Sequence, residues 1–336
     1  MATAAVLGAS GYLGGELLRL LSTHPEFSLS AVVSASHAGE PLSQFWPNLA
    51  DSTLRAQSEA SSLDVDVAFC AEPAGEAMKQ VPALLDAGTR VVDLGPDYRL
   101  PDPSAYAATY GQTHQDPEHL SEAAYGLPEL FREKIRRARL VANPGCYPTA
   151  TLLALAPLLT AREIVGPVVV DAKSGTSGAG SSLSSGTHHP EAALTVQPYG
   201  TPQHRHVPEM RAAMTALAGS SPSLVFVPHL VPLVRGILCS IYPTLADGAH
   251  PDRWPALFDA SYAGSPFVHR GPTPRLSWAQ GTNRCFLSLQ QAGDAPVLFS
   301  ALDNLGKGGA AQAIQNANLM FGFDEAAGLR QPGFGV

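Results

Sequence analysis

A glycine-rich turn near the N-terminus constrains the fold of this chain more than any other feature. The apolar run 4–7 leads directly into Gly8-Ala9-Ser10-Gly11-Tyr12-Leu13-Gly14, and a helical pattern of leucines follows. Glycine allows the backbone angles of a tight turn and lets a pyrophosphate approach the amides at the helix N-terminus, whose dipole attracts anions. We therefore predict a dinucleotide site that includes Gly8, Ser10, Gly11, Tyr12, Leu13 and Gly14. The spacing is GxxGxxG, and an ordinary tight turn is the alternative.

The loop after the second predicted strand bears on the choice of cofactor. An Asp or Glu at the end of that strand would bind the ribose 2′-hydroxyl of NAD. The strand instead ends at Val33 and leads into Ser34-Ala35-Ser36-His37. Hydroxyl groups can donate to a 2′-phosphate, so Ser34 and Ser36 are expected at the cofactor and NADP(H) is favoured over NAD(H). A plain polar loop is the alternative.

The order of apolar runs predicts two domains, since 336 residues exceed the usual size of one core. Short strands alternate with helices in the first part, which is typical of a parallel sheet with crossover helices; we expect strands at 4–7, 29–33, 65–69, 90–94 and 139–142. Longer strands with fewer helices then predict a mixed sheet, with strands at 166–172, 223–228, 233–243, 284–290 and 296–302. A last helix, 307–320, carries one apolar face that can pack on the first domain. The long Gly-, Ser- and His-rich segment 173–208 is expected to be a functional loop.

Composition excludes several classes of function. Charged residues are 15% of the chain, the net charge is −8 and the 21 basic residues are scattered, so no nucleic-acid partner is expected. No apolar run reaches the roughly 18 residues that span a bilayer, and no secretion signal is recognisable. We expect a cytoplasmic protein without a membrane partner. No metal site is expected either, because the histidines show no recurring ligand spacing.

One of the four cysteines stands in a distinctive setting. Cys70, Cys239 and Cys285 lie in apolar runs, where a small buried residue is the expected role. Cys146 instead lies in Asn143-Pro144-Gly145-Cys146-Tyr147-Pro148, between a strand and an apolar helical run. Proline is tolerated only in the first helical turn, so Cys146 is predicted at a helix N-terminus, where the dipole stabilises a thiolate. A nucleophile is predicted, and a buried residue at a helix cap is the alternative.

A thiolate beside a nicotinamide points to one type of reaction. The sulfur displaces a leaving group from an activated acyl donor to give a thioester, and hydride transfer followed by collapse of a thiohemiacetal gives an aldehyde. The steps can also run in reverse. We therefore predict an oxidoreductase that interconverts an activated acyl group and an aldehyde.

Six sequence blocks resemble those of the N-acetyl-γ-glutamyl-phosphate reductases, a family of the semialdehyde dehydrogenase superfamily that serves arginine biosynthesis. The blocks follow the family's order over nearly the whole chain: 8–12, 125–129, 143–149, 171–180, His204-Arg205-His206 with Pro208-Glu209, and Asp303-Asn304-Leu305 with Lys307-Gly308. The resemblance implies NADPH as reductant and the acyl phosphate N-acetylglutamyl 5-phosphate as a small-molecule substrate. It also implies a homo-oligomer, either a dimer or a tetramer.

The resemblance further implies the domain organisation. A Rossmann-type domain with a doubly wound parallel sheet is expected from residues 1–145 and 306–336, completed by the C-terminal helix. A second α+β domain with a mixed sheet, residues 146–305, is expected to serve catalysis and oligomerisation. The fold class is therefore α/β.

Site roles follow from the resemblance and from side-chain chemistry. Cys146 forms the thioester and His206 supplies the acid or base, since an imidazole can move a proton at neutral pH. In an extended segment His204 and His206 would share one face, so either of them is a candidate for the proton transfer. Arg205 either pairs with Glu209 or holds a substrate carboxylate.

The other substrate and cofactor contacts are expected at seven positions. Arg99 is the candidate for the acyl-phosphate oxygens, with a surface ion pair to Asp97 or Asp102 as the alternative. Asn143, Ser174, His204, Arg205 and Glu209 are expected at the substrate, and Asn304 at the nicotinamide amide.

The sequence also departs from the family pattern. Ala35 stands where an arginine is common, the segment Asp93-Leu94-Gly95-Pro96-Asp97 is atypical, and Ser181 replaces an expected arginine. The alternatives are a lysine-pathway relative that reduces a carrier-bound aminoadipyl phosphate, an aspartate-semialdehyde dehydrogenase, and a dinucleotide-binding sensor without catalytic activity.

Overall fold

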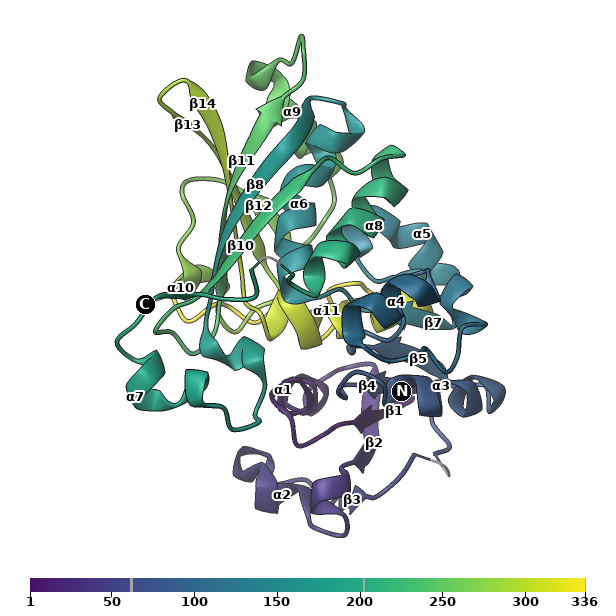
Figure 1. Cartoon of the computed structure of the whole chain (residues 1–336). Coiled ribbons are helices and arrows are strands. Elements are labelled where there is room, and N and C mark those ends of the chain that lie inside the picture. Colours follow the sequence, from purple (N-terminus) through teal and green to yellow (C-terminus); the bar gives the residue numbers. More distant parts are fainter. Residues whose placement is uncertain (61–62, 202, 336) are drawn as a thin grey trace. The chain divides into compact units, whose positions relative to one another are not determined.

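The computed structural model describes residues 1–60, 63–201 and 203–335, and the chain forms two compact units (Figure 1). Unit 1 contains Met1–Pro144 and Gly309–Gln331. Unit 2 contains Gly145–Gly308 and the C-terminal residues from Pro332.

Unit 1 is built on a parallel sheet of seven strands in the order β3-β2-β1-β4-β5-β7-β6. The strands are β1 (Ala2–Leu7), β2 (Phe27–Val33), β3 (Ala56–Gln57), β4 (Val67–Cys70), β5 (Arg90–Asp93), β6 (Ala124–Tyr125) and β7 (Leu140–Ala142). The chain order reverses between β1 and β4, as in doubly wound sheets, and dinucleotides bind beyond the carboxyl ends of strands at such a switch point. The parallel sheet predicted for the first part of the chain is confirmed.

The described residues of unit 1 form six α-helices: α1 (Tyr12–Leu21), α2 (Leu42–Phe45), α3 (Ala77–Asp86), α4 (Pro103–Tyr110), α5 (Pro128–Arg137) and α11 (Ala311–Phe321). The chain returns to unit 1 through α11, which packs against α1, α5 and β5, so the predicted packing of the last helix on the first domain is confirmed. Residues 311–320 are all buried, so the polar side chains of this helix lie in the interior as well. The Asn316 amide, for example, donates to the carbonyl of Gly126 at 2.8 Å and to Oδ1 of Asn143 at 3.0 Å.

A π-helical turn, η7 (Gly306–Ala310), precedes α11, so the regular helix begins later than predicted. A Cβ at Gly306 would overlap the carbonyl of Thr282, and Gly309 has non-helical backbone angles. The glycines that interrupt the helical pattern therefore shape a turn.

Unit 2 contains a mixed sheet in the order β12-β13-β14-β11-β8-β10-β9. The strands are β8 (Ile164–Ser174), β9 (Gln197–Pro198), β10 (Leu224–Leu230), β11 (Ile237–Leu245), β12 (Val268–Arg270), β13 (Cys285–Ala292) and β14 (Ala295–Leu302). Two pairs, β8 with β10 and β12 with β13, are parallel, and the other pairs are antiparallel. The predicted mixed sheet is confirmed.

The helices of unit 2 are α6 (Cys146–Thr160), α7 (His189–Ala192), α8 (His206–Ala218), α9 (Trp254–Ser261) and α10 (Leu276–Ala279). The apolar helix α6 packs against β8, β11, β14, α8 and α9, and it is the centre of the core of unit 2. The segment expected to be a loop contains short elements: η4 (Thr176–Ala179), η5 (Ser185–Thr187), α7, β9 and the start of α8.

Two features are absent from the described residues. None of the helices there is both long enough and apolar enough to cross a bilayer. No group of three or more His, Cys, Asp or Glu side chains there is arranged to hold a metal ion.

Candidate active site

The candidate nucleophile, Cys146, is the first residue of α6, which confirms its predicted place at a helix N-terminus. Every residue from 147 to 159 is buried, so packing holds the helix that carries the thiol in place. Cys146 is partly exposed, whereas Cys70, Cys239 and Cys285 are fully buried. Burial raises the pKa of the Cys70 and Cys239 thiols, which keeps both protonated. Among the four cysteines, Cys146 is the one that a solute can reach.

The candidate acid/base residue, His206, is the first residue of α8, whose N-terminal turn lies beside that of α6. The Gly145 N–H donates to Oε1 of Glu209 at 2.8 Å, which joins the two turns. A Cβ at Gly145 would lie 2.5 Å from Nε2 of His206, so the imidazole is packed on the residue that precedes Cys146. His206 is 5% exposed and Glu209 is 1% exposed, so this junction is almost dry.

A second glycine, Gly308, borders the nucleophile. A Cβ at Gly308 would lie 2.8 Å from Cβ of Cys146, closer than real carbon atoms approach. The Gly308 N–H donates to the carbonyl of Asp303 at 2.8 Å, and this bond sets the path of the turn. The first turn of α6 is therefore enclosed by two positions that accept glycine alone.

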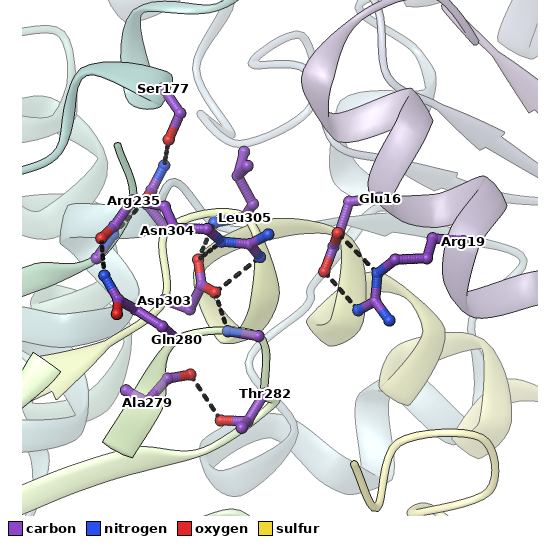
Figure 2. Close-up of polar contacts among 12 residues, drawn as sticks. Glu16, Arg19, Ser177, Arg235, Ala279, Gln280, Thr282, Asp303, Asn304 and Leu305 are labelled. Atoms are coloured by element: carbon purple, nitrogen blue, oxygen red, sulfur yellow. Dashed lines mark hydrogen bonds and ion pairs between the residues drawn. The ribbon is translucent and has the colours of Figure 1, made fainter. Parts of the chain in front are cut away.

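The loop that carries Gly308 is held by a buried ion pair, which Figure 2 shows. Arg235 grips Asp303 with two bonds, from Nε to Oδ1 at 3.0 Å and from Nη2 to Oδ2 at 2.7 Å. Asp303 is fully buried and also accepts from the backbone N–H groups of Gly281 and Leu305. Since all four bonds satisfy one carboxylate, the turn after β14 is rigid.

Asn304, expected at the nicotinamide, is joined to the same loop network. Its Oδ1 accepts from the Gly236 N–H at 2.7 Å, and its amide donates to Oγ of Ser177 at 3.0 Å (Figure 2). Ser174 is buried nearby, where its hydroxyl donates to the carbonyl of Gly175 at 3.0 Å. A Cβ at Gly178 would touch Oγ of Ser174 at 3.3 Å and Nδ2 of Asn304 at 3.8 Å. Ser174 and Asn304 thus line one glycine turn of unit 2.

The prediction that His204 and His206 lie in an extended segment is wrong, because α8 begins at His206 and Arg205 has helical angles. The two imidazoles nevertheless meet, with ring centroids 4.9 Å apart. Pro208 and Glu209 fit the first turn of a helix, which accounts for the early start. Arg205 is exposed, whereas Glu209 is buried and accepts from the Gly145 N–H, so these two side chains lie in different surroundings.

The glycine turn of unit 1 connects β1 to α1, as predicted. Gly8 has a positive φ of 75°, and a Cβ there would overlap the carbonyl of Ala71. A Cβ at Gly14 would overlap the carbonyl of Gly8, whereas one at Gly11 would meet nothing closer than 3.5 Å within the described chain. The fold of the turn therefore requires glycine at positions 8 and 14, whereas a side chain at position 11 would meet no other part of the turn closely. Among the described side chains none caps the α1 N-terminus, beside which Tyr12 is exposed and Leu13 is partly buried.

Three serine hydroxyls gather beside this turn. Ser34 donates to Oγ of Ser10 at 3.1 Å, and Oγ of Ser36 lies 3.3 Å from that of Ser34 and 3.4 Å from that of Ser10. Nδ1 of His37 lies 2.9 Å from Oγ of Ser36. Ser10 and Ser36 are half-buried or exposed, so the hydroxyl group of each can turn toward a ligand. The arrangement fits a dinucleotide whose ribose end lies at the carboxyl end of β2.

Arg99 bonds to the backbone of two loops. Its guanidinium donates to the carbonyls of Asn143 at 2.9 Å and Leu94 at 2.7 Å. Asp97 accepts from the Gly75 and Met78 N–H groups and the Tyr106 hydroxyl, and Asp102 caps α4. Arg99 therefore joins the loops that follow β5 and β7.

The buried Asn143 side chain forms hydrogen bonds within unit 1. The residue is 1% exposed, its amide donates to the carbonyl of Gly309 at 3.3 Å, and its Oδ1 accepts from Asn316. The side chain therefore fastens the end of β7 to α11 and faces the interior.

Asp93, at the carboxyl end of β5, is buried near Asp97. Burial, and then the Asp97 charge, raise the pKa of Asp93 to about 7, although Arg99 opposes the shift. The folded protein therefore holds a proton on Asp93 between about pH 4 and pH 7, where an unfolded chain has lost it. Stability conferred by this group is present below pH 4 and is lost as the pH rises to 7.

We expect Asp93→Asn to remove this loss, because the amide cannot ionise. The variant should gain up to about 4 kcal/mol relative to the wild type between pH 4 and pH 8. Urea unfolding at several pH values measures the difference. Asp294→Asn, in the exposed turn after β13, is the control. Parallel pH profiles for Asp93→Asn and the wild type would contradict the assignment.

Several residues of the site were not anticipated from the sequence. Gly145 and Gly308 were visible only as members of motifs, although a glycine on either side of a reactive cysteine is itself a signal of close packing. Tyr199 and Arg235 gave no local signal, because their partners Tyr147 and Asp303 lie 52 and 68 residues away.

Comparisons with known proteins agree with this geometry. Residues 3–138 match the family model "Semialdehyde dehydrogenase, NAD binding domain", and residues 146–304 match "Semialdehyde dehydrogenase, dimerisation domain". The chain is 44% identical over 334 residues to an N-acetyl-gamma-glutamyl-phosphate reductase from Halorhodospira halophila, and the match covers 96% of each chain.

Two solved structures share the fold. Aspartate semialdehyde dehydrogenase II from Vibrio cholerae superposes with a TM-score of 0.71 at 18% identity, covering 96% of this chain and 98% of that one. Aspartate semialdehyde dehydrogenase from Candida albicans, solved with NADP, gives a TM-score of 0.68 at 16% identity, with the same coverage. The matched NAD binding domain supports a nicotinamide dinucleotide as the cofactor.

Proposed function

Because this chain belongs to the family of N-acetyl-gamma-glutamyl-phosphate reductases, we propose that it reduces N-acetyl-L-glutamyl 5-phosphate to N-acetyl-L-glutamate 5-semialdehyde and phosphate. The reductant in this proposal is NADPH. The observation that carries the chemistry is the junction of α6 and α8, where a partly exposed cysteine and a buried histidine begin adjacent helices.

Cys146 performs the covalent step in this proposal. Its thiolate attacks the acyl carbon, the C–O bond to the phosphate breaks, and the phosphate leaves with the electron pair, so that a thioester forms on the sulfur. The N-terminal ends of α6 and α8 both lie beside this position, and their dipoles favour the anionic sulfur. NADPH, when bound, supplies the hydride that takes the acyl group from the thioester to the aldehyde oxidation level.

His206 moves protons at the same carbon. As acid it donates a proton to the oxygen that becomes anionic when hydride arrives, and as base it takes that proton back when the C–S bond breaks and the aldehyde leaves. The dry contact between His206 and Gly145 keeps the imidazole beside the sulfur through both steps. Gly308 leaves room for the acyl group because any side chain there would press on Cys146.

The serine cluster supports a preference for NADP. Ser10, Ser34 and Ser36 present hydroxyl donors without a carboxylate among them, and the His37 ring lies next to Ser36. A 2′-phosphate would replace their mutual hydrogen bonds with charge-assisted ones. The Arg99 guanidinium is the candidate for the phosphate of the substrate, because its planar fork suits a phosphate group.

We expect Ser36→Asp to reverse the cofactor preference. A carboxylate at this position repels a 2′-phosphate and can accept from a 2′-hydroxyl, so KM for NADPH should rise by about 10²-fold while kcat changes little. Steady-state kinetics with NADPH and NADH measure the change, and Ser36→Ala, which removes a donor without adding charge, is the control. An unchanged ratio of the two kcat/KM values would place the 2′-phosphate elsewhere.

The open face of the unit 2 sheet supports self-association. Figure 1 shows α6 and α8 on one side of β8, β10 and β11. Side chains of the other side include exposed Val225 and Tyr242, which flank Val169 in register. These residues form an apolar row on a sheet of the segment that matches the dimerisation domain. Such a row fits a homo-oligomer.

We expect Val225→Glu to weaken the oligomer at least about 10²-fold, because a charge would be buried in the contact without a partner. Light scattering coupled to size exclusion across a dilution series measures the change. Leu183→Glu, at a fully exposed position outside the sheet, is the control. A Val225→Glu protein that keeps the wild-type mass at all concentrations would exclude this face.

One experiment tests the proposed function. The reverse reaction is measured with NADP, phosphate and each of three semialdehydes, derived from N-acetylglutamate, aspartate and aminoadipate. The first should give the highest kcat/KM, by at least about 10²-fold. A preference for either of the other two would assign the chain to that substrate. Absence of turnover with all three, together with intact NADP binding, would favour a sensor.

A further inference from the structure

We infer that His204 is a neutral positioning residue, which orients His206 at the start of α8 and does not itself transfer the proton. This inference rests on the proposed role of His206 as the acid/base residue. It answers a question that the sequence leaves open, since either imidazole of the pair suits proton transfer.

The first observation is a hydrogen bond that fixes the protonation of His204. The backbone N–H of His206 donates to Nδ1 of His204 at 3.1 Å. Nδ1 therefore presents a lone pair, and the neutral ring carries its hydrogen on Nε2. Protonation of Nδ1 would break a bond that satisfies an N-terminal amide of α8. Charging His204 thus loosens the turn that holds His206.

The second observation is an aromatic enclosure around His204. Its ring contacts Tyr147 from α6, Tyr199 from the segment after β9, and Phe226 from β10, with centroids 5.7, 5.6 and 5.1 Å away. Edge contacts of this kind favour a neutral ring in a fixed orientation, since they replace much of the water around it.

The charged and titratable groups around His204 are Arg205, His206, Tyr147 and Tyr199, and Cys146 lies close enough to influence both tyrosines. Desolvation, and then the positive Arg205, lower the pKa of His204 to about 4. Burial raises the pKa of Tyr199 to about 12, so its hydroxyl remains neutral as well. At pH 7 His204 is thus uncharged and places no positive charge beside His206.

The third observation connects this enclosure to the nucleophile. The Tyr199 hydroxyl donates to the hydroxyl of Tyr147 at 3.0 Å, and Tyr147 directly follows Cys146. The Tyr199 N–H also donates to the carbonyl of Pro228 in β10. Tyr199 therefore ties the segment that carries His204 to both α6 and β10. Sulfur, His206 and His204 are held by one set of contacts, which is what a positioning role requires.

Two substitutions at His204 separate positioning from proton transfer. In His204→Asn, Oδ1 can take the place of Nδ1 as the acceptor from the His206 N–H, so kcat should stay within about fivefold of the wild type. In His204→Phe the ring contacts remain but the acceptor is lost. We expect kcat to fall by about 10- to 10²-fold, with a shifted pH profile and little change in KM. His206→Asn is the reference for loss of the acid/base group.

A measurement without turnover accompanies the kinetics. NMR titration of the intact protein labelled at histidine Cε1 should show the His204 signal unchanged between pH 5 and 8. The inference is overturned if His204 titrates in that range, if His204→Asn loses as much activity as His206→Asn, or if His204→Phe matches the wild type. Full activity of His206→Asn would instead overturn the proposed acid/base role, and the NMR titration would still decide the charge of His204.

Discussion

Cys146→Ala should abolish reduction of the acyl phosphate, with kcat at least about 10⁴-fold lower, while NADPH binds nearly as tightly as before. The variant retains both helix N-termini and His206, so what it lacks is the atom that forms the thioester. Single-turnover kinetics measure the lost step, and fluorescence titration with NADPH measures the retained affinity.

A matched control comes from the buried cysteines. Cys285→Ala removes a thiol in β13, and it should leave kcat within about twofold of the wild type apart from a modest loss of stability. In the wild type, iodoacetamide should label Cys146 first, and mass spectrometry after a short pulse identifies the site. Turnover by Cys146→Ala at the wild-type rate would remove the thioester from the mechanism.

His206→Asn should lower kcat by about 10²- to 10⁴-fold, since proton transfer by a positioned side chain contributes that much. Asparagine keeps a polar group at the start of α8 but cannot exchange a proton at neutral pH. The pH profile of kcat should therefore lose the limb that reports this imidazole. Rapid-quench measurement of the acyl-enzyme should show that Cys146 is still acylated while aldehyde formation is slow.

His188→Asn serves as the control for His206→Asn, because His188 is exposed and directly precedes α7. It should behave as the wild type. If kcat fell equally in His188→Asn and His206→Asn, the effect would not come from the junction of α6 and α8.

Local pattern was sufficient for five strands of unit 1 and for the start of α6, but not for the two-residue strands β3 and β6. Each of the five strands is a short apolar run, and Pro148 is favourable in a first turn, which agrees with Cys146 at the helix start. The sequence signal and the fold agree in such places because neighbours along the chain decide the conformation.

Local pattern also indicates the start of α8, although this position lies within the segment that is expected to be a loop. Pro208 and Glu209 suit a first turn, and the apolar residues Met210, Ala213 and Met214 follow at helical spacing. The glycines and serines upstream obscured this short pattern. The second histidine therefore emerged as a helix terminus only in the folded chain.

The turn after β14 could not have been foreseen from sequence. Asp303 and Asn304 obtain their partners from residues 235, 236 and 177, and no local pattern encodes such distant pairs. The same holds for α11, where the Asn316 amide bonds to residues 126 and 143. The apolar spacing of this helix predicts that it packs on unit 1, but it does not indicate partners so distant along the chain.

The burial of α11 within unit 1 has a consequence for synthesis of the protein. A nascent chain that has been translated up to β14 contains the strands of unit 1 but lacks α11, which packs on β5, α1 and α5 and bonds to Asn143. Unit 1 is thus begun before unit 2 but is not completed until the unit 2 sheet has been synthesised. Until α11 emerges, the apolar surface that it covers is exposed and is a natural client for chaperones that bind unfinished chains.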